Sequence, residues 1–571
     1  MQEYARRTLW PTQLGVGVKS GTEIGIHTVR AWVQRQAAVP GKVLLKLDFV
    51  NTFNRISRHQ VLESSASHFP GLARWVTWCY QQPSALQFGS TTIQSAGGVQ
   101  QGNPLGPLLF ATAIHSLTQE LRAGPLDLAV FYLDDGIIAG DAAAVGAALA
   151  HIQTRGATLG LALNPAKCDV IAVGSVCDAD LAGHLPQEFL TSSDGSSRLQ
   201  RNFEFLGGAI GDDTFVEAHT TARVAAVSPL LDALSRLGDA QVGLRLLRSC
   251  AGCGRLVHSM RCNPPHSQAS AFQLFDAKLQ ATFSSITGLH LTAEQRCQAG
   301  RSLGFAGLGL RSSSLDAPAA FLASVGGCAV ACEEVDPAYV AAAVVFEPAC
   351  TSAAASLSAC LVHPLAPGAA LSMKQKALTH LLYEASWQVQ LASSSTTRQA
   401  LLRSEAEPGA RAFLTATPGG STRMETAIFV TKLRHRLGIP DSVQDCWCPQ
   451  CHGILDALSL HAGTCVAGGE KTLRHTAVRD VLCKWADRAG LQPEKERQGL
   501  LLPQRPEEVG AQNRRPADIF LPSLHGTPAA LDLAITAPQR QDIVAQAAGA
   551  ALAAASAYAA TKASHLNTAH L

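Results

Sequence analysis

Two adjacent aspartates, Asp134 and Asp135, interrupt an apolar run in the segment 130–138. The β-branched and aromatic residues on both sides predict a strand, an acidic turn and a second strand. Two carboxylates side by side on a hairpin repel each other unless a cation lies between them. Taken alone, such a pair also fits a solvated turn. Its interpretation therefore depends on which other residues the chain brings to it.

Three further segments accompany this hairpin in a fixed order: Leu47–Asn54, Gly98–Phe110 and Leu159–Lys167. In the first, a buried strand ends on Asp48, and in the second a glycine- and proline-rich loop leads into an apolar helix. Each has an ordinary alternative, since Asp48 could cap a helix beginning near Asn51 and Lys167 could be a surface lysine. The four segments together, in this order, are hard to obtain by chance.

A chemistry that needs this combination is nucleotidyl transfer. That reaction uses two divalent cations about 3.5–4 Å apart, one activating the primer hydroxyl and one holding the leaving pyrophosphate. Magnesium prefers carboxylate and phosphate oxygens. Asp134 and Asp135 on a hairpin, with Asp48 at the end of a neighbouring strand, would supply such ligands.

In these segments the chain resembles the reverse transcriptase family, and within it the polymerases of LINE-like non-LTR retroelements. The segment around Asp48 looks like motif A, and Gln101-Gly102 with Pro104-Leu105 looks like motif B. Tyr132-Leu133-Asp134-Asp135 is similar to the Tyr-x-Asp-Asp box of motif C. Gly160 to Lys167 looks like motif D, and Phe205-Leu206-Gly207 like the primer-grip turn. The resemblance covers roughly residues 10–215.

The resemblance implies roles for individual residues. Asp48 and Asp134 would bind two Mg²⁺ ions, with Asp135 as a weaker or structural partner. Phe53 would be the steric gate against ribonucleotides, Gln101 and Gly102 would line the nascent base pair, and Lys167 would donate a proton to pyrophosphate. The implied partners are an RNA template, a DNA primer or target and deoxynucleotide triphosphates, in the nucleus.

We therefore expect an α/β multidomain protein. The first expected part (1–215) is a right-hand polymerase palm, built of an antiparallel sheet with helices, with truncated fingers. It is followed by a helical thumb and connector (216–435), a zinc knuckle (441–470) and an α/β restriction-endonuclease-like domain (471–571). The basic fingers hairpin expected ahead of Asp48 would be missing or reduced to Arg6 and Arg7. Within the helical region, the arginine-rich stretch Thr221–Arg261 fits either a solvated helix face or a phosphate-binding face.

A cysteine and histidine cluster follows the helical region. Cys448 and Cys451 are separated by two residues, and His461 and Cys465 by three, so each pair can bind one side of a tetrahedral zinc ion. Cys446 is left out because the two-residue spacing favours Cys448. The alternative is four free, buried cysteine and histidine side chains. In related elements such a knuckle follows the polymerase and is thought to hold nucleic acid.

The C-terminal region predicts a helix, Ala477–Ala489, then strand-like pieces at 515–521 and 530–536. Asp518 and Asp532 would face each other across a hairpin and could share one magnesium ion. This resembles the restriction-like PD-(D/E)xK endonuclease, with Glu496 added from the preceding helix. Ala534 stands where that family has lysine, and Lys562 on the following helix is the expected replacement. The alternative is two ordinary strand-end aspartates.

The composition fits an intracellular globular protein. Hydrophobic residues make up 47% and charged residues 16% of the chain, which allows large cores and argues against long disordered tails. No signal peptide follows Met1, and the alanine-rich stretch Ala545–Ala560 drives membrane insertion only weakly. Two hypotheses stay open: an active polymerase that could also nick its target DNA, and a truncated or domesticated copy that only binds nucleic acid.

Overall fold

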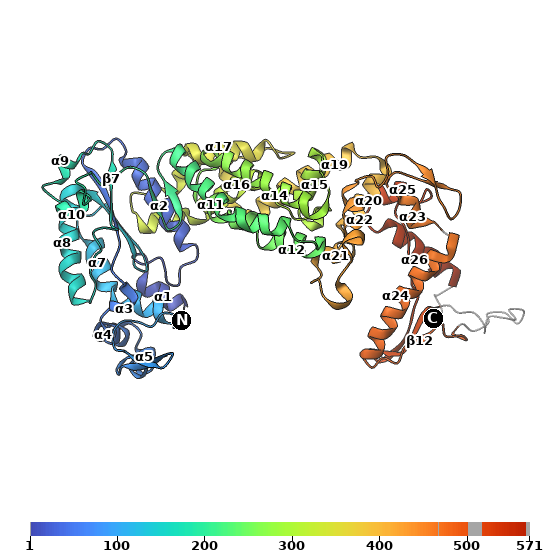
Figure 1. Cartoon of the computed structure of the whole chain (residues 1–571), viewed down its shortest axis with the longest axis horizontal. Coiled ribbons are helices and arrows are strands. Elements are labelled where there is room, and N and C mark those ends of the chain that lie inside the picture. The colour runs from blue at the N-terminus through green and yellow to red at the C-terminus, as the bar shows by residue number, and fades with distance from the viewer. Residues whose placement is uncertain (1, 466, 501–516, 567–571) are drawn as a thin grey trace, which may run out of the picture. The chain divides into compact units, whose positions relative to one another are not determined.

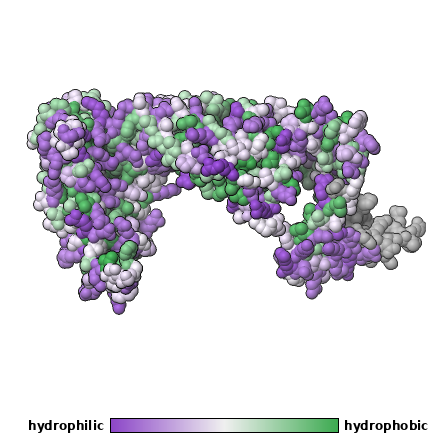
Figure 2. Space-filling model, viewed as in Figure 1, coloured by the Kyte–Doolittle hydropathy of each residue, from purple (hydrophilic) through white to green (hydrophobic). Residues whose placement is uncertain are grey.

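The structure is a computed structural model of the chain (Figure 1). It describes residues 2–465, 467–500 and 517–566. These residues form two compact units, each made from several stretches of the chain. The first unit comprises residues 1–229, 253–278 and 312–382, and the second comprises residues 230–252, 279–311 and 383–571. The face drawn in Figure 2 is mostly hydrophilic with scattered apolar side chains, as is usual for a protein surface.

The first unit contains most of the strands. Its elements are α1 (Gln2–Leu9), α2 (Gly21–Gln36), β1 (Lys42–Leu47), α3 (Thr52–Arg55), α4 (Arg58–His68), α5 (Pro70–Tyr80), β2 (Ser84–Phe88), β3 (Thr91–Ser95), α6 (Gly106–Ala113), α7 (His115–Ala123), β4 (Leu128–Tyr132), β5 (Asp135–Asp141), α8 (Ala142–Thr158), β6 (Asp169–Val173), α9 (Asp178–Leu181), α10 (Gln187–Leu190), β7 (Leu199–Gln200), β8 (Phe203–Phe205), β9 (Gly208–Ile210), η1 (Cys253–Arg255), α13 (Val257–Cys262), η2 (His266–Gln268), α16 (Ser313–Val335), η4 (Ala341–Phe346), α17 (Pro348–Ser358) and α18 (Pro367–Ser372). Three helices are shared between the two units: α11 (Asp213–Ser235), α14 (Ala269–Thr287) and α19 (Gln375–Ser393).

A five-stranded sheet forms the centre of the first unit, in the order β4-β5-β1-β6-β7. Neighbouring strands are antiparallel except β6 and β7, which are parallel. Val43 and Leu45 join one cluster of buried side chains, while Leu44, also buried, points to the opposite face because side chains alternate along a strand. The central strand is therefore covered on both faces, which explains its continuous apolar run.

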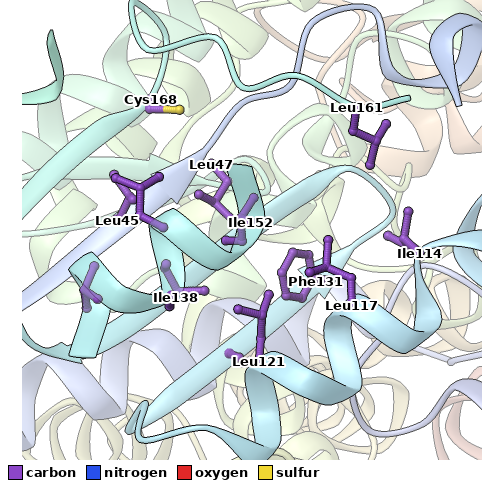
Figure 3. Packing of buried hydrophobic residues seen from close by; sticks show 14 of the residues in the cluster. Leu45, Leu47, Ile114, Leu117, Leu121, Phe131, Ile138, Ile152, Leu161 and Cys168 are labelled. Carbon is purple, nitrogen blue, oxygen red and sulfur yellow. The ribbon is translucent and has the colours of Figure 1, made fainter. Parts of the chain in front are cut away.

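Helices pack their apolar stripes on this sheet. Leu117 and Leu121, one turn apart on α7, and Ile152 on α8 lie against Phe131 and Ile138 of the sheet (Figure 3). The apolar side chains of these helices thus form the buried surface against the sheet. The coarse expectation of a mixed α/β domain is met.

The expected remnant of a basic fingers hairpin is not found at Arg6 and Arg7. Both lie on α1, where Arg7 pairs with Glu3 at 2.5 Å and Arg6 lies over the Trp10 ring. A helix places successive side chains on different sides, so these two arginines cannot project together as a hairpin would. A hairpin does occur after Asp48, formed by β2 and β3, and the sequence analysis did not anticipate it.

Helix α16 is the core helix of the first unit. Among the described residues it alone is long and apolar enough to cross a membrane by length and composition. However, 72% of its most apolar stretch is buried inside the protein. It also carries Ser324, which donates to Glu23 on α2 at 2.7 Å. These contacts are typical of a helix that packs against other helices of its own chain.

The arginines of the stretch 221–261 mostly bind the protein itself. Arg261 forms a bidentate ion pair with Glu23, and Arg223 donates to the carbonyl of Gly207. In the second unit, Arg245 and Arg248 donate to backbone carbonyls. Each of these four arginines thus donates at least one hydrogen bond within the protein, and binding of phosphate by this stretch stays a prediction.

The second unit is mostly helical. Its elements are α12 (Ala240–Ser249), α15 (Ala293–Gly300), η3 (Leu303–Phe305), α20 (Thr396–Ala406), η5 (Gly409–Arg411), α21 (Ala412–Thr415), η6 (Gly420–Thr422), α22 (Thr426–Leu437), β10 (Cys446–Trp447), β11 (Ile454–Leu455), α23 (Leu460–Thr464), η7 (Ala467–Gly469), α24 (Glu470–Arg488), β12 (Glu494–Lys495), β13 (Ile519–Leu524), β14 (Thr527–Leu531), α25 (Val544–Gly549) and α26 (Ala553–Leu566). The first two residues of the predicted strand 515–521, Arg515 and Pro516, lie outside the described residues.

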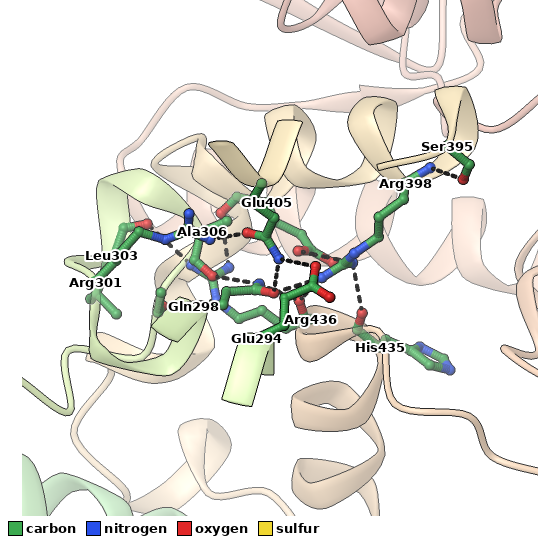
Figure 4. A network of polar contacts seen from close by, with 12 residues as sticks. Glu294, Gln298, Arg301, Leu303, Ala306, Ser395, Arg398, Glu405, His435 and Arg436 are labelled. Atoms are coloured by element: carbon green, nitrogen blue, oxygen red, sulfur yellow. Dashed lines mark hydrogen bonds and ion pairs between the residues drawn. The ribbon is translucent and has the colours of Figure 1, made fainter. Parts of the chain in front are cut away.

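A buried polar network joins α15, α20 and α22 (Figure 4). The side-chain amide of Gln298 donates to the carbonyl of Arg436, and its oxygen accepts from Arg398 at 2.9 Å. Glu405 lies 3.7 Å from Arg398, yet one of its carboxylate oxygens is buried without a hydrogen-bond partner among the described residues. Burial raises the pKa of Glu405 to about 8, against the opposing effect of Arg398 and Arg436. Burial thus favours the neutral form of the Glu405 carboxyl.

We expect Glu405→Gln to leave stability nearly unchanged at pH 5, because glutamine mimics the neutral carboxyl. The pKa of Glu405 is higher in the folded than in the unfolded state. The neutral carboxyl therefore stabilises the fold fully below the unfolded pKa, and this contribution is lost as the pH rises towards 8. Relative to the variant, the wild-type free energy of unfolding should fall by up to about 1.4 kcal/mol per pH unit across that window. Urea unfolding of both proteins from pH 5 to 8 measures this difference, and parallel curves would contradict it.

Candidate active site

The two adjacent aspartates lie where β4 turns into β5. Tyr132 pairs with Asp135 across the hairpin, so Leu133 and Asp134 form the turn. Leu133 has a φ of +57°, in the left-handed region that matches the twist of a two-residue hairpin. The predicted order of strand, acidic turn and strand is therefore present.

Asp48 follows the last residue of β1 at the same end of the sheet. Leu47 pairs with Gly136, so the register continues to Asp48 opposite Asp135, and directly opposite residues share a face of the sheet. Burial raises the pKa of Asp135. The neighbouring charges of Asp134 and Asp48 raise this pKa further, and Lys46 lowers it. The sheet thus holds Asp48 and Asp134 close enough to Asp135 to disfavour its charged form, and a bound cation would relieve this repulsion. Asp48 is not a helix cap, because the residue before α3 is Asn51.

A buried glutamine that the sequence analysis missed holds the acidic turn. Gln13 accepts a hydrogen bond from the backbone N–H of Leu133 at 2.6 Å and donates to its carbonyl at 3.2 Å. It also accepts from the backbone of Gly15. Both backbone groups of the residue before Asp134 are therefore fixed by one side chain. Only the three-dimensional contact identifies Gln13, since a lone glutamine in a loop carries no signal of its own.

The loop before α6 is attached to α3, which carries Phe53. Val99 donates its backbone N–H to the carbonyl of Phe53 at 2.6 Å. Gly98 has a φ of +66°, and a Cβ there would lie 2.4 Å from the backbone of Asn54, so only glycine allows this approach. The ring of Phe53 stacks on that of Phe110 with centroids 4.6 Å apart. The residues expected to contact the nucleotide are thus linked to one another.

Gln101 and Gly102 are exposed in the turn that leads into α6. Lys167 is also exposed, in a turn where its backbone N–H donates to Asn164. That turn is tied to the acidic end of the sheet, because Asn164 donates to the carbonyl of Asp48 at 2.8 Å. The side chains of Gln101 and Lys167 and the backbone of Gly102 are exposed to solvent, and their roles stay predictions.

The hairpin of β8 and β9 carries the turn that resembles a primer grip. Leu206 and Gly207 both have positive φ values, 47° and 79°, which is the conformation of a tight two-residue turn. Their carbonyls accept hydrogen bonds from His258 at 3.0 Å and Arg223 at 2.7 Å. The turn is therefore held from the helices α13 and α11.

In the second unit, one ligand atom from each of Cys448, Cys451, His461 and Cys465 lies within 4.8 Å of the other three. Cys451 Sγ lies 3.1 Å from His461 Nε2. Backbone N–H donation from Gln450 is the main cause that lowers the pKa of Cys448 to about 6. Three sulfurs and one imidazole in such a group are a donor set that zinc prefers. Cys446 lies exposed on β10 and does not belong to the group.

A second carboxylate pair lies at the ends of β13 and β14. Asp518 precedes β13, Asp532 follows β14, and the backbone N–H of Asp518 donates to Leu531 at 3.0 Å. Lys562 on α26 lies 3.2 Å from Asp532. Burial lowers the pKa of Lys562, but Asp532 and then Asp518 outweigh it and raise the pKa. Lys562 therefore pairs with one of the two aspartates, and its role at this pair stays a prediction.

The structure corrects two details around this pair. Helix α24 begins at Glu470, earlier than the predicted Ala477. Glu496 is not on a helix but follows β12, where its backbone N–H donates to Asp518 and its carboxylate pairs with Arg479. The strand at 494–495 has only two residues and is too short to give a periodic pattern, so Glu496 was assigned to a helix.

His475 is a further residue of this region that the sequence analysis passed over. Its Nε2 lies 3.2 Å from a carboxylate oxygen of Asp518 and 3.1 Å from the carbonyl of Leu533. Because a carbonyl can only accept, Nε2 is the donor here. His475 and Arg479 are one turn apart on α24 and face the carboxylates together, and that spacing was the available signal.

Comparisons with known proteins support part of this description. Residues 15–210 match the family model described as reverse transcriptase (RNA-dependent DNA polymerase), which is less than half of the chain. Among curated proteins no relative matches.

Two similar solved structures are telomerases. One is from Candida albicans, in complex with a fragment of telomeric RNA, with 12% identity, a TM-score of 0.29 and coverage of 62% of this chain and 52% of that chain. The other is apo telomerase from Candida tropicalis, with 11% identity, a TM-score of 0.29 and coverage of 67% and 59%. The chain thus spans little more than half of each telomerase chain, and TM-scores this low support no argument. On the family match, residues 15–210 form a reverse transcriptase domain, an RNA-directed DNA polymerase module.

Proposed function

We propose that this protein copies RNA into DNA with the carboxylates at the end of its central sheet. The observation that carries the proposal is the group Asp48, Asp134 and Asp135, gathered at one sheet end within the matched segment 15–210. Carboxylates gathered in this way, which raise the pKa of Asp135, favour a bound cation. Lys46 offsets only part of this charge.

In this proposal Asp48 and Asp134 bind two magnesium ions, with Asp135 as a supporting ligand. When bound, these ions would activate the primer hydroxyl and neutralise charge on the leaving pyrophosphate. Phe53 presses against the sugar of the incoming nucleotide, and Gln101 and Gly102 line the new base pair. Gln13 keeps the acidic turn in one conformation, which pre-organises the ligands.

Lys167 is the proposed proton donor to pyrophosphate. Its support is the attachment of its turn to Asp48 through Asn164 and its exposed side chain. The partners of the reaction are an RNA template, a DNA primer and deoxynucleotide triphosphates.

The finer assignment is to a LINE-like non-LTR retroelement, working in the nucleus. The support is the order of parts along the chain: reverse transcriptase domain, helical region, cysteine and histidine group, then the paired aspartates. In this reading 216–435 act as thumb and connector, and a zinc-bound knuckle holds nucleic acid.

A second function is nicking of the target DNA by the C-terminal carboxylates. The observation that favours it is the contact of Lys562 with Asp532, because a lysine beside a carboxylate pair can offset charge developing at a phosphate. Asp518 and Asp532 would hold one magnesium ion, which polarises the scissile phosphate when bound. The competing proposal is a domesticated copy that binds nucleic acid without turnover.

The polymerase proposal predicts that Asp134→Ala abolishes primer extension on an RNA template. Loss of a metal ligand should reduce the rate by about a thousandfold or more, since such ligands contribute several kcal/mol. Glu188→Ala is the matched control, because Glu188 is an exposed acid on α10 of the same unit. Extension assays with magnesium measure both. A wild-type protein as silent as Asp134→Ala would favour the binding-only copy.

The knuckle proposal predicts about one zinc ion per chain, lost on Cys451→Ser. Cys446→Ser should keep its zinc, because Cys446 lies outside the four-residue group. Elemental analysis of freshly purified, reduced protein gives the ratio. Absence of zinc from the wild type, or equal loss in both variants, would refute the assignment.

The nicking proposal predicts that magnesium-dependent relaxation of supercoiled DNA disappears in Asp532→Ala and falls strongly in Lys562→Ala. Asp487→Ala, an exposed acid at the end of α24, should nick as the wild type does. Gel assays of plasmid topology measure all four proteins. Nicking that survives Asp532→Ala would rule out this site. A wild-type protein that does not nick would refute the proposed nicking activity but not the fold of this region.

A further inference from the structure

Helix α24 has two faces of different chemistry. The inner face carries His475 and Arg479, which contact Asp518 and Glu496, together with the buried Cys483. On the outer side, Leu473, Val478, Val481 and Trp485 are exposed by 63, 48, 45 and 62% of their surfaces. Four large apolar side chains exposed on one helix are unusual for a surface without a partner.

These residues form a continuous face with two cations. With about 100° between successive residues, Val478, Val481 and Trp485 fall within about 60° of one another, and Lys484 and Arg488 lie beside them. We define the α24 outer face as Leu473, Val478, Val481, Lys484, Trp485 and Arg488. Its length from Leu473 to Arg488 is about 22 Å, at roughly 1.5 Å per residue.

The charge of the outer face is positive. Lys484 and Arg488 are exposed and form no ion pair with any carboxylate of the described residues, and Lys471 at the start of α24 is in the same situation. The acid Asp480 is already paired with Arg479 and Lys495. Asp487 lies at the border of the face. An occupant of this surface must therefore be anionic and must also cover apolar side chains.

We propose that the α24 outer face binds single-stranded nucleic acid. A single strand offers phosphates to Lys484 and Arg488 and, unlike a duplex, also offers free base faces to stack on Trp485. Trp485 and Arg488 are three residues apart, so a ring and a guanidinium group are neighbours on the helix surface. The face is long enough for a few nucleotides, within the usual range for single-strand sites.

This surface goes beyond the proposed reactions, because binding needs neither nucleotide addition nor strand cleavage. It does have a consequence for them. The outer face and the Asp518 cluster lie on opposite sides of one helix, about 10 Å apart across a helix diameter. A strand bound there is held next to the paired aspartates rather than in them, as a displaced single strand beside a cleavage site would be.

The test uses the full chain with a photo-crosslinking benzoylphenylalanine at position 481, which keeps Trp485 in place. The probe is a labelled single-stranded DNA oligonucleotide of about 15 nucleotides, without magnesium or deoxynucleotides. The same amino acid at Phe346, which is 80% exposed on η4 of the first unit, is the control position. Crosslink yield against oligonucleotide concentration gives an affinity for this surface alone. We expect crosslinking at position 481, competed by single strands and not by duplex.

Substitutions of Trp485 and of the two outer-face cations, made in the position-481 background, test the chemistry. Trp485→Ala should weaken binding about tenfold and Trp485→Phe much less, because a phenyl ring still stacks. Lys484→Glu with Arg488→Glu should remove binding at moderate salt. The matched control is Lys374→Glu with Lys376→Glu, the same change of charge at two exposed lysines of the first unit. Replacing both outer-face cations by neutral glutamine should lower the slope of log affinity against log salt by about 1.4.

The proposal is overturned by absent crosslinking at position 481, by equal yields at positions 481 and 346, or by equal competition from duplex DNA. Crosslinks to a second protein chain instead of the oligonucleotide would show that the face docks protein and would also overturn it. The result is independent of polymerase and nicking activity, because neither reaction can run under these conditions. Circular dichroism checks that each variant keeps its helices.

Discussion

The first unit is organised around carboxylates that a sheet holds together against their own repulsion. Asp48, Asp134 and Asp135 lie at one end of adjacent strands, where burial and then the charges of Asp134 and Asp48 raise the pKa of Asp135. The free energy that keeps them there comes from the strands on both sides, which are buried on the two faces of the sheet. A loosely packed sheet would let the charged ends separate. The large apolar core therefore also keeps the acidic site in place.

The second carboxylate centre handles the same repulsion differently. Asp532 has a lysine of its own chain at 3.2 Å, and Asp518 is fixed by His475 and by the backbone of Leu533. Charges of opposite sign are therefore supplied by the protein itself rather than left to a ligand. The two centres differ in what they need from outside: the first has an excess of negative charge, and the second is already partly neutralised. A metal ion should accordingly change the electrostatics of the first centre more.

Features set by local sequence patterns could be predicted, whereas features set by contacts between distant residues could not. The acidic hairpin, the strand before Asp48, the glycine loop and the spacing of the four zinc-type ligands follow from local rules of strands, turns and metal geometry, so they were predictable. Gln13, by contrast, acts on a residue 120 positions away, and no periodicity reveals such a contact. The same holds for the contacts of Arg223 with the Gly207 carbonyl and of Arg261 with Glu23. Glu496 was misplaced because its short strand has no pattern of its own.

Helix α24 is an example of a feature that its sequence pattern does not reveal. Its sequence mixes cations and apolar residues on nearly every side, so no single amphipathic stripe is visible. In the fold, Lys495 of β12 pairs with Asp480, and Asp518, which precedes β13, accepts a hydrogen bond from His475 on the inner side. Asp480 is thereby engaged at the inner site, whereas Lys484 and Arg488 of the outer face form no ion pair with a described carboxylate. The positive charge of the outer surface therefore depends in part on how Asp480 is paired at the inner site.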